Sequence, residues 1–217
     1  CKIPEGEEER FEALPEEYSH LYLAVSGELA AVICVADPLR EEAEAVVDGL
    51  HQLGVKKLVM MTGDSEKTAR AVARMVGVDA FYAEVLPEDK ANFIRKEHEA
   101  GRKAIMLGDG VNDSPALSEA DAGIAIRDGA AIAREVADIT IGGDDLYALL
   151  TLKQLSDALM GRIHRNYRNI IGFNLMLICL GVAGILPPAT SALLHNISTL
   201  VISLKSMTNL LEEPQSF

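Results

Sequence analysis

The fold of this chain is decided by residues 103–117, which read KAIMLGDGVNDSPAL. Lys103–Leu107 has the short apolar pattern of a buried strand, and the glycines that follow it mark a tight turn. Two carboxylates and an amide, those of Asp109, Asp113 and Asn112, lie within five residues on that turn. Hard oxygen ligands on a glycine turn suit Mg²⁺, which takes one or two carboxylates plus phosphate oxygens. An Asx-rich turn that only caps the next helix is the alternative interpretation.

Strands and helices alternate around this stretch. Amphipathic helical patterns cover 40–53, 65–76 and 88–100, and each is followed by a glycine that ends it. Short strand patterns cover 21–25, 29–35, 57–61, 81–85, 103–107, 123–126 and 138–141. Apolar strands that alternate with amphipathic helices form right-handed βαβ units around a buried parallel sheet. The sequence therefore predicts an α/β fold with a Rossmann-like parallel sheet, which ends at about residue 145.

Two other segments follow predicted strands, at the edge where an open parallel sheet builds its site. Thr62-Gly63-Asp64 offers a hydroxyl and the free N–H groups of a helix start to phosphate oxygens, although a plain helix N-cap has the same composition. Lys90 lies in the first turn of the next predicted helix, where a cation opposes the helix dipole. This placement makes sense if Lys90 faces an anion, and a solvated surface lysine is the alternative.

Composition narrows the class of protein. The chain has 217 residues and a formal net charge of −13. This acidic balance argues against a nucleic-acid-binding surface, which would need a basic face. The cysteines, Cys1, Cys34 and Cys179, form no C-x-x-C pair, so a zinc or redox signature of that type is absent from the sequence.

The C-terminal part of the chain has a different character. Apolar residues recur at steps of three and four over 146–168, and this stretch ends in a basic cluster. Two uncharged runs follow, Ile170–Leu186 and Ala189–Leu204, separated by Pro187-Pro188. Each run is near the short limit of the roughly 17–25 residues that cross a bilayer as a helix. We expect a transmembrane helical hairpin with the α/β head on the cytoplasmic side of the basic cluster, and a buried soluble hairpin is the alternative.

The chemistry-bearing segments, taken together, resemble the later motifs of P-type ATPases within the haloacid dehalogenase superfamily. The matching segments are Thr62-Gly63-Asp64, Pro87-x-x-Lys90 and Gly108-Asp109-Gly110-x-Asn112-Asp113, and the last continues into the pump-like Ser114-Pro115-Ala116-Leu117. Asp37-Pro38-Leu39-Arg40 resembles the family's hinge between nucleotide and phosphorylation domains. A single helix hairpin after the α/β head resembles the arrangement in the heavy-metal subgroup of this family. The resemblance covers residues 21–211.

The resemblance implies roles, cofactors and partners. It implies an ion-translocating ATP hydrolase that uses Mg²⁺ and ATP and moves a heavy-metal cation across a lipid bilayer, expected to be the cell membrane. The implied site residues are Asp64, Lys90 and Asp109 for catalysis, Thr62, Gly63 and Lys90 for phosphate, Asp109 and Asp113 for Mg²⁺, Asn112 for support of the loop, and Arg40 for the hinge and nucleotide.

The family's nucleophile is the Asp of an Asp-Lys-Thr-Gly-Thr motif, and no such motif occurs in this sequence. We therefore expect a fragment or truncated product, with the nucleophile in a missing N-terminal portion and no covalent step in this chain alone. The resemblance divides the chain into the end of a nucleotide-binding domain (1–36), the C-terminal part of a phosphorylation domain (37–145), an amphipathic connecting helix (146–168) and two transmembrane helices (169–211). A membrane-anchored phosphatase and a non-catalytic membrane docking module remain as alternatives.

Polar residues in the two uncharged runs are candidates for the path of the transported ion. They are Asn174, His195, Ser198 and Thr199, and the last three share one helix face at spacings of three and four. Hydrogen bonding between packed helices is the alternative role. The stretch 195–199 is similar to the family's His-Glu-Gly-x-Thr pattern but lacks its Glu and Gly, so the metal stays undecided.

Overall fold

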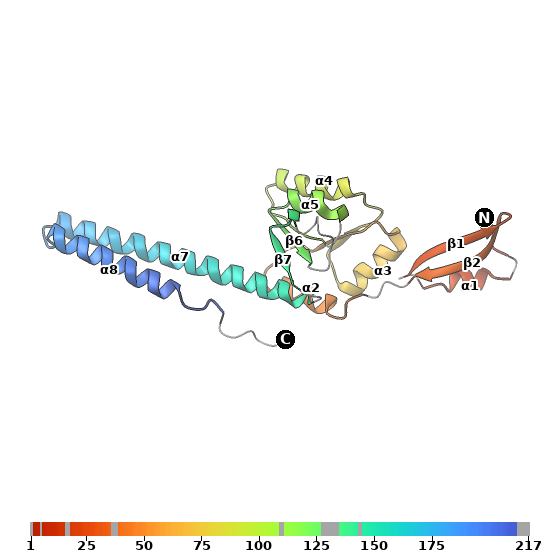
Figure 1. The fold of residues 1–217 in the computed structure, drawn as a ribbon, viewed down its shortest axis with the longest axis horizontal. Helices are drawn as coiled ribbons and strands as arrows, with labels where there is room; N and C mark the ends of the chain where they lie inside the picture. Colours follow the sequence, from red (N-terminus) through yellow and green to blue (C-terminus); the bar gives the residue numbers. More distant parts are fainter. Residues whose placement is uncertain are drawn as a thin grey trace. The chain divides into compact units, whose positions relative to one another are not determined.

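The computed structural model describes residues 2–4, 6–15, 18–35, 39–108, 111–126, 135–142 and 145–211. The chain divides into two compact units, Cys1–Leu149 and Leu150–Phe217. The first unit contains an N-terminal hairpin and a series of alternating strands and helices, and the second is helical (Figure 1).

The N-terminal hairpin consists of β1 (Ser19–Val25) and β2 (Glu28–Val35), which pair antiparallel. Ser26 and Gly27 make its turn with positive φ angles of 53° and 86°. Two successive positive φ angles match the right-handed twist of the strands that they connect. The two strands predicted at this end of the chain are thus confirmed.

The rest of the first unit is an α/β arrangement. With the short α1 (Glu8–Glu12) ahead of the hairpin, its elements are α2 (Ala43–Gln52), β3 (Val59–Met61), α3 (Glu66–Val76), β4 (Ala80–Tyr82), α4 (Pro87–Glu99), β5 (Ile105–Gly108), a 3-10 turn (Val111–Asp113), α5 (Ser114–Glu119), β6 (Ala122–Ile126) and β7 (Ile139–Ile141). Strand β3 pairs in parallel with β4, and β6 pairs in parallel with β5 and β7. The predicted parallel α/β fold is confirmed, although the described strands hydrogen-bond as two separate parallel sheets.

Several element boundaries differ from the prediction by one to three residues, and two of these differences have a local cause. Helix α2 begins at Ala43 instead of residue 40, because residues 41 and 42 form a turn before it. The strand predicted over 81–85 occupies Ala80–Tyr82. The chain leaves this strand early because Glu84 has a left-handed backbone, with φ of 53°, which an extended strand cannot contain.

Caps and close contacts fix the helices on the sheets. Helix α3 starts after Ser65, whose hydroxyl accepts a hydrogen bond from the Thr68 N–H, and ends at Gly77 in the left-handed conformation. Under α5, a Cβ at Gly123 would lie 2.5 Å from the Leu117 carbonyl oxygen, so only glycine fits there. The buried apolar side chains of this unit include Val46, Val47, Ala69, Ala73, Ala91, Ile94, Ala116, Leu117, Ile124, Ala125 and Ile141.

Three aspartates make the same kind of contact, in which a carboxylate accepts a backbone N–H at the amino end of a parallel strand. The Asp79 carboxylate accepts the Leu58 N–H at 2.6 Å, and the Asp121 carboxylate accepts the Ala104 N–H at 2.9 Å. Asp138 accepts the Gly123 N–H at 2.9 Å in the same way. Each contact ties the residue before one strand to the neighbouring strand or to the residue just before it, so it helps to fix the register of that parallel pair.

Asp121 has the largest set of partners in this group. Lys103 Nζ lies 2.6 Å from its Oδ1, and His98 Nε2 lies 2.8 Å from its Oδ2. The hydrogen bond from Lys103, then that from the Ala104 N–H, and further the one from His98 lower the pKa of Asp121 to about 2. Since the folded pKa lies below the ordinary value, ionised Asp121 stabilises the fold above about pH 4, and this contribution is lost as pH falls towards 2.

We expect Asp121→Asn to lower the melting temperature at pH 7 and to matter less as the pH falls. The amide still accepts the Ala104 N–H but gives up its charged contacts with Lys103 and His98, so the loss is electrostatic. Thermal unfolding of both proteins between pH 7 and pH 2 measures the difference. Glu66→Gln, which removes an exposed pair with Arg70 on α3, is the matched control and should change the melting temperature little. A difference for Asp121→Asn that stays constant down to pH 2 would contradict this account.

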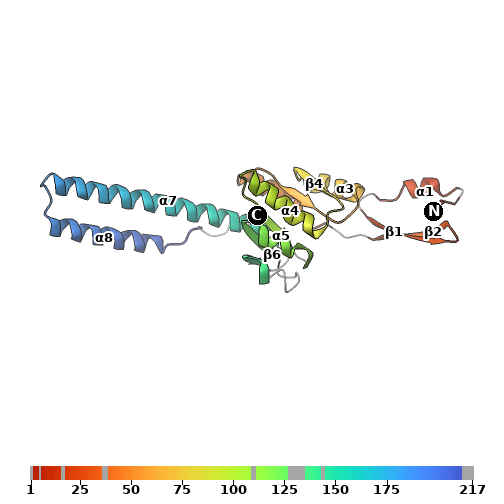
Figure 2. The same ribbon diagram turned by 90° about the horizontal axis from the view of Figure 1, so that it is seen from above.

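The second unit is a pair of helices that run side by side, α7 (Tyr147–Val182) and α8 (Pro188–Ser206) (Figures 1 and 2). The amphipathic stripe predicted over 146–168 and most of the first uncharged run lie in one continuous helix, and no proline interrupts residues 147–182. Across the residues that the structure describes, no helix combines the length and the apolar character needed to cross a membrane.

Arg162 of α7 binds the C-terminal end of α8. Its guanidinium donates to the carbonyl oxygens of Ser206 at 2.8 Å, Thr208 at 2.6 Å and Asn209 at 2.7 Å. Asn166, one turn further along α7, donates to the Ser206 hydroxyl at 2.7 Å. A cation at this end complements the helix dipole and satisfies carbonyls that have no partner within the helix.

Candidate active site

Thr62, Gly63 and Asp64 form a loop between β3 and α3. The Thr62 hydroxyl donates to Asp64 Oδ2 at 2.6 Å, and the Asp64 N–H donates to Thr62 Oγ1 at 3.1 Å. The helix cap itself is provided by Ser65. Thr62 and Asp64 are therefore not needed as the cap, and the loop presents a hydroxyl, a carboxylate and the start of a helix together. The hydroxyl and the N–H groups at the start of the helix can bind phosphate oxygens.

Lys90 and Asp113 form an ion pair between α4 and the turn that follows β5. Lys90 Nζ lies 2.7 Å from Asp113 Oδ1, and the side chains are only 15% and 12% exposed. The interpretation of Lys90 as a solvated surface lysine is therefore wrong. Asp113 also packs onto Gly108, where a Cβ would lie 2.7 Å from the Asp113 Cβ. Glycine at 108 is thus required by the position of the carboxylate.

The other predicted site residues are placed as follows. Asp109, Gly110, Asp37 and Pro38 lie outside the described residues. Asn112 is exposed on the 3-10 turn, and Arg40 lies ahead of α2, with its guanidinium 4.0 Å from the Glu42 carboxylate. Within the described ranges, no group of three or more His, Cys, Asp or Glu side chains is placed to hold a metal ion. The Asp113 carboxylate on its glycine turn is nevertheless the kind of hard oxygen donor that Mg²⁺ takes together with phosphate oxygens.

Two residues beside the site, Glu84 and Val85, were not selected from the sequence. The Glu84 N–H donates to the Asp64 carbonyl at 2.9 Å, and the Val85 N–H donates to the Thr62 carbonyl at 3.0 Å. Both residues belong to the stretch that was predicted as a strand. Neither is a glycine or an asparagine, so no local signal in the sequence marks this turn.

The candidate ion-path residues lie in the helical unit and contact one another. His195 Nδ1 lies 2.8 Å from Asn174 Oδ1, which joins α8 to α7. The hydroxyls of Ser198 and Thr199 donate to the His195 carbonyl at 2.8 and 3.0 Å. Because an amide oxygen only accepts, His195 donates from Nδ1, and in the neutral ring its Nε2 then carries the lone pair.

Comparison with known proteins fits these observations. The chain matches the family of haloacid dehalogenase-like hydrolases over residues 2–121, and it belongs to that family. Within the family, its relatives are heavy-metal P-type ATPases. It is 44% identical to "Copper-transporting ATPase 2" of Rhizobium meliloti (strain 1021), over 82% of this chain and 21% of that protein. It is 40% identical to "Zinc-exporting P-type ATPase" of Mycobacterium marinum, over 84% of this chain and 25% of that protein.

A solved structure supports the same relationship. A zinc-transporting PIB-type ATPase in its E2.Pi state matches 94% of this chain with a TM-score of 0.82 and 26% sequence identity, and the match covers 34% of that protein. The chain spans only about a fifth to a quarter of the length of the two curated relatives named above.

Proposed function

We propose that this chain is part of an ATP-driven pump for heavy-metal cations, in which an aspartate is phosphorylated and dephosphorylated in each cycle. The observation that carries the proposal is the partly buried ion pair between Lys90 and Asp113 on the glycine turn after β5. Desolvation offsets much of the attraction within such a pair, so a purely structural role explains it poorly. The relatives that are named for copper and zinc transport support the same class of activity.

In the proposed site, two loops act on one phosphoryl group. The Gly63 N–H binds its oxygens at the start of α3, the Thr62 hydroxyl does so when it turns away from Asp64, and Lys90 neutralises their charge. Asp64, which accepts a hydrogen bond from the Thr62 hydroxyl, orients phosphate and water. Phosphoryl transfer depends mainly on positioning and on neutralisation of oxygen charge, and these residues provide both.

Mg²⁺ and ATP are the proposed cofactors. Asp109 and Asp113 would hold Mg²⁺, and Asn112 would support the loop between them. When bound, the ion neutralises charge on the phosphoryl oxygens. Arg40, beside Glu42, would belong to the hinge towards the nucleotide-binding domain.

The nucleophilic aspartate would come from a segment of the pump that lies upstream of Cys1. Among the described strands, β3 pairs with β4 alone and β5 with β6 alone, so each leaves an edge that another strand can join. Ile105 and Leu107 of β5 are 65% and 38% exposed, whereas strands of parallel sheets are ordinarily covered on both faces. A strand added between β3 and β5 would bring an aspartate to the same edge as Thr62 and the Gly108 turn.

We also propose the domain division predicted from the sequence: 1–36, 37–145, 146–168 and 169–211, with the last segment in the cell membrane and the α/β head in the cytoplasm. Exposed apolar side chains along both helices, such as Leu175, Ile178 and Leu200, support a location among lipids or other helices. The polar side chains that lie among these apolar ones would then be covered by the other membrane helices of the complete pump.

The contact between Asn174 and His195 is the proposed part of the ion path. Asn174 would orient the imidazole so that Nε2 faces the transported cation, as outer hydrogen bonds do for histidines that bind metals. Ser198 and Thr199 share the same helix face and would line the path. A neutral imidazole suits borderline cations such as zinc, cobalt or nickel.

The proposal is tested by ATP hydrolysis of the complete protein in lipid vesicles, with copper, zinc and manganese ions added in turn. We expect one of these ions to stimulate hydrolysis and to accumulate across the vesicle membrane. Hydrolysis of simple phosphate monoesters without any dependence on a transition metal would instead support the membrane-anchored phosphatase.

A further inference from the structure

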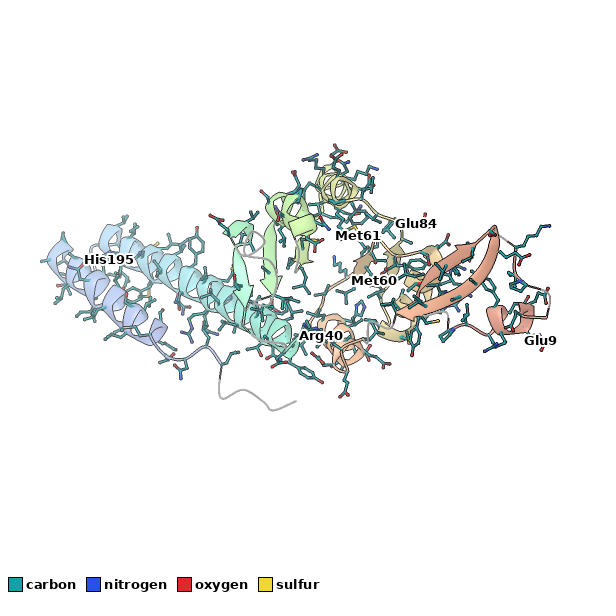
Figure 3. All side chains as sticks on the ribbon, turned by 45° about the vertical axis from the view of Figure 1, so that its right-hand side comes forward. Glu9, Arg40, Met60, Met61, Glu84 and His195 are labelled. Atoms are coloured by element: carbon teal, nitrogen blue, oxygen red, sulfur yellow. The ribbon has the colours of Figure 1, made fainter. Side chains whose placement is uncertain are left out.

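Residues 82–85 hold the Thr62–Asp64 loop through the backbone. The Thr62 N–H donates to the Tyr82 carbonyl at 3.0 Å, which continues the pairing of β3 with β4. Beyond that point the Val85 N–H donates to the Thr62 carbonyl and the Glu84 N–H donates to the Asp64 carbonyl. Glu84 and Met61, the last residue of β3, are both labelled in Figure 3. One short segment thus fixes the loop at both Thr62 and Asp64.

An extended chain could not make these contacts. In a strand, the N–H groups of consecutive residues point to opposite sides, so Glu84 and Val85 could not both donate to the same neighbouring loop. The positive φ of Glu84 turns the chain between them. Among the described non-glycine residues, only Ser26 in the hairpin turn shares such an angle, and for both residues φ is 53°. Backbones of this kind in residues with side chains are uncommon and often lie beside functional groups.

We propose that Glu84 is a positioning residue for phosphoryl transfer, and that it acts through its backbone conformation. It places the N–H groups of Glu84 and Val85 on the carbonyls of Asp64 and Thr62, and thereby fixes the loop that carries the Thr62 hydroxyl, the Gly63 N–H and the Asp64 carboxylate. This inference rests on the proposed function, because the placement of the loop matters only if the loop binds phosphoryl oxygens.

Variants of Glu84 in the complete pump test the proposal, with phosphoenzyme formation from inorganic phosphate as the measurement. Glu84→Gly accepts the left-handed backbone freely, and Glu84→Ala keeps a Cβ but removes the carboxylate. Both should need about the same phosphate concentration for half-maximal phosphoenzyme as the unmodified pump. The β-branched side chain in Glu84→Val disfavours the left-handed backbone, so the loop moves, and we expect that concentration to rise on the order of 10- to 100-fold.

Ser26→Val is the matched control, since it places the same side chain on the same φ angle in the hairpin turn. It should lower the melting temperature as Glu84→Val does but leave the half-maximal phosphate concentration unchanged. A stability effect alone therefore cannot imitate the expected result.

Two outcomes would overturn the proposal. If Glu84→Gly and Glu84→Ala are impaired as much as Glu84→Val, the carboxylate acts instead of the backbone. If all three variants bind phosphate normally, the left-handed backbone of Glu84 has no role in positioning the loop. Should Glu84→Val fail to fold, amide hydrogen exchange in the unmodified chain decides, because the Glu84 and Val85 amides must be protected if they hold the loop. Absence of any phosphoenzyme from the unmodified pump would count against the proposed function. The hydrogen-exchange result would still show whether the Glu84 and Val85 amides hold the loop.

Discussion

Replacing Lys90 by methionine in the complete pump should reduce phosphorylation from ATP by about 10²-fold or more, because one preorganised charge on the phosphoryl oxygens is lost. The same change leaves the Asp113 carboxylate buried without its cation, and breaking such a pair costs about 3 kcal/mol of stability. Phosphoenzyme measurement alone cannot separate these two effects, so stability must be measured beside it.

The double variant Lys90→Met with Asp113→Asn separates them. Neutralising both partners removes the unpaired buried charge, so most of the lost melting temperature should return. Phosphorylation should stay low, since the charge on Lys90 is still absent and the proposed Mg²⁺ ligand Asp113 is neutralised as well. If phosphorylation returns together with stability, the ion pair is only structural and Lys90 does not act on the phosphoryl group.

Replacing His195 by alanine should raise the metal concentration for half-activation of ATP hydrolysis by about tenfold or more, since the proposed ligand atom Nε2 is removed. Formation of the phosphoenzyme from inorganic phosphate should remain largely intact, because that reaction uses residues of the α/β unit. The two measurements, made on the same preparation, separate damage to the ion site from damage to the phosphorylation site in the α/β unit.

His164→Ala is the matched control for this prediction. His164 also lies in the helical unit and bonds through Nδ1 to a backbone carbonyl, that of Met160, at 2.8 Å, but it is not on the proposed path. Its removal should leave the metal dependence unchanged. If His195→Ala has a lower melting temperature and an unchanged half-activation concentration, the contact with Asn174 is only a hydrogen bond between helices.

Local patterns in the sequence predicted most of the α/β unit. Strand and helix periodicity, together with stops such as Gly77, depends on neighbours in the chain, and the structure confirms the resulting elements. The division of the strands into two hydrogen-bonded sheets could not be predicted, because pairing between strands depends on the whole set of strands present. Helix α7 runs from residue 147 to 182 without a break, and no proline in that stretch interrupts it.

The candidate site was predicted residue by residue but not as a set of contacts. Lys90 and Asp113 were each selected from the sequence, and their ion pair joins residues that are 23 positions apart. Glu84 was missed because its side chain carries no turn signal and its role depends on a backbone angle. The contact between His195 and Asn174 was missed for a similar reason, since helical spacing relates residues within one helix and says little about the facing helix.

Acid-stable, hydroxylamine-sensitive labelling from radioactive ATP, carried out on the complete protein and on this chain alone under the same conditions, shows whether an aspartate is phosphorylated. We expect about one labelled aspartate per complete protein and none on this chain, because the motif that carries the nucleophile is absent from its sequence. Stoichiometric labelling of this chain alone, or no labelling of the complete protein in the presence of Mg²⁺ and its transported metal, would contradict this expectation.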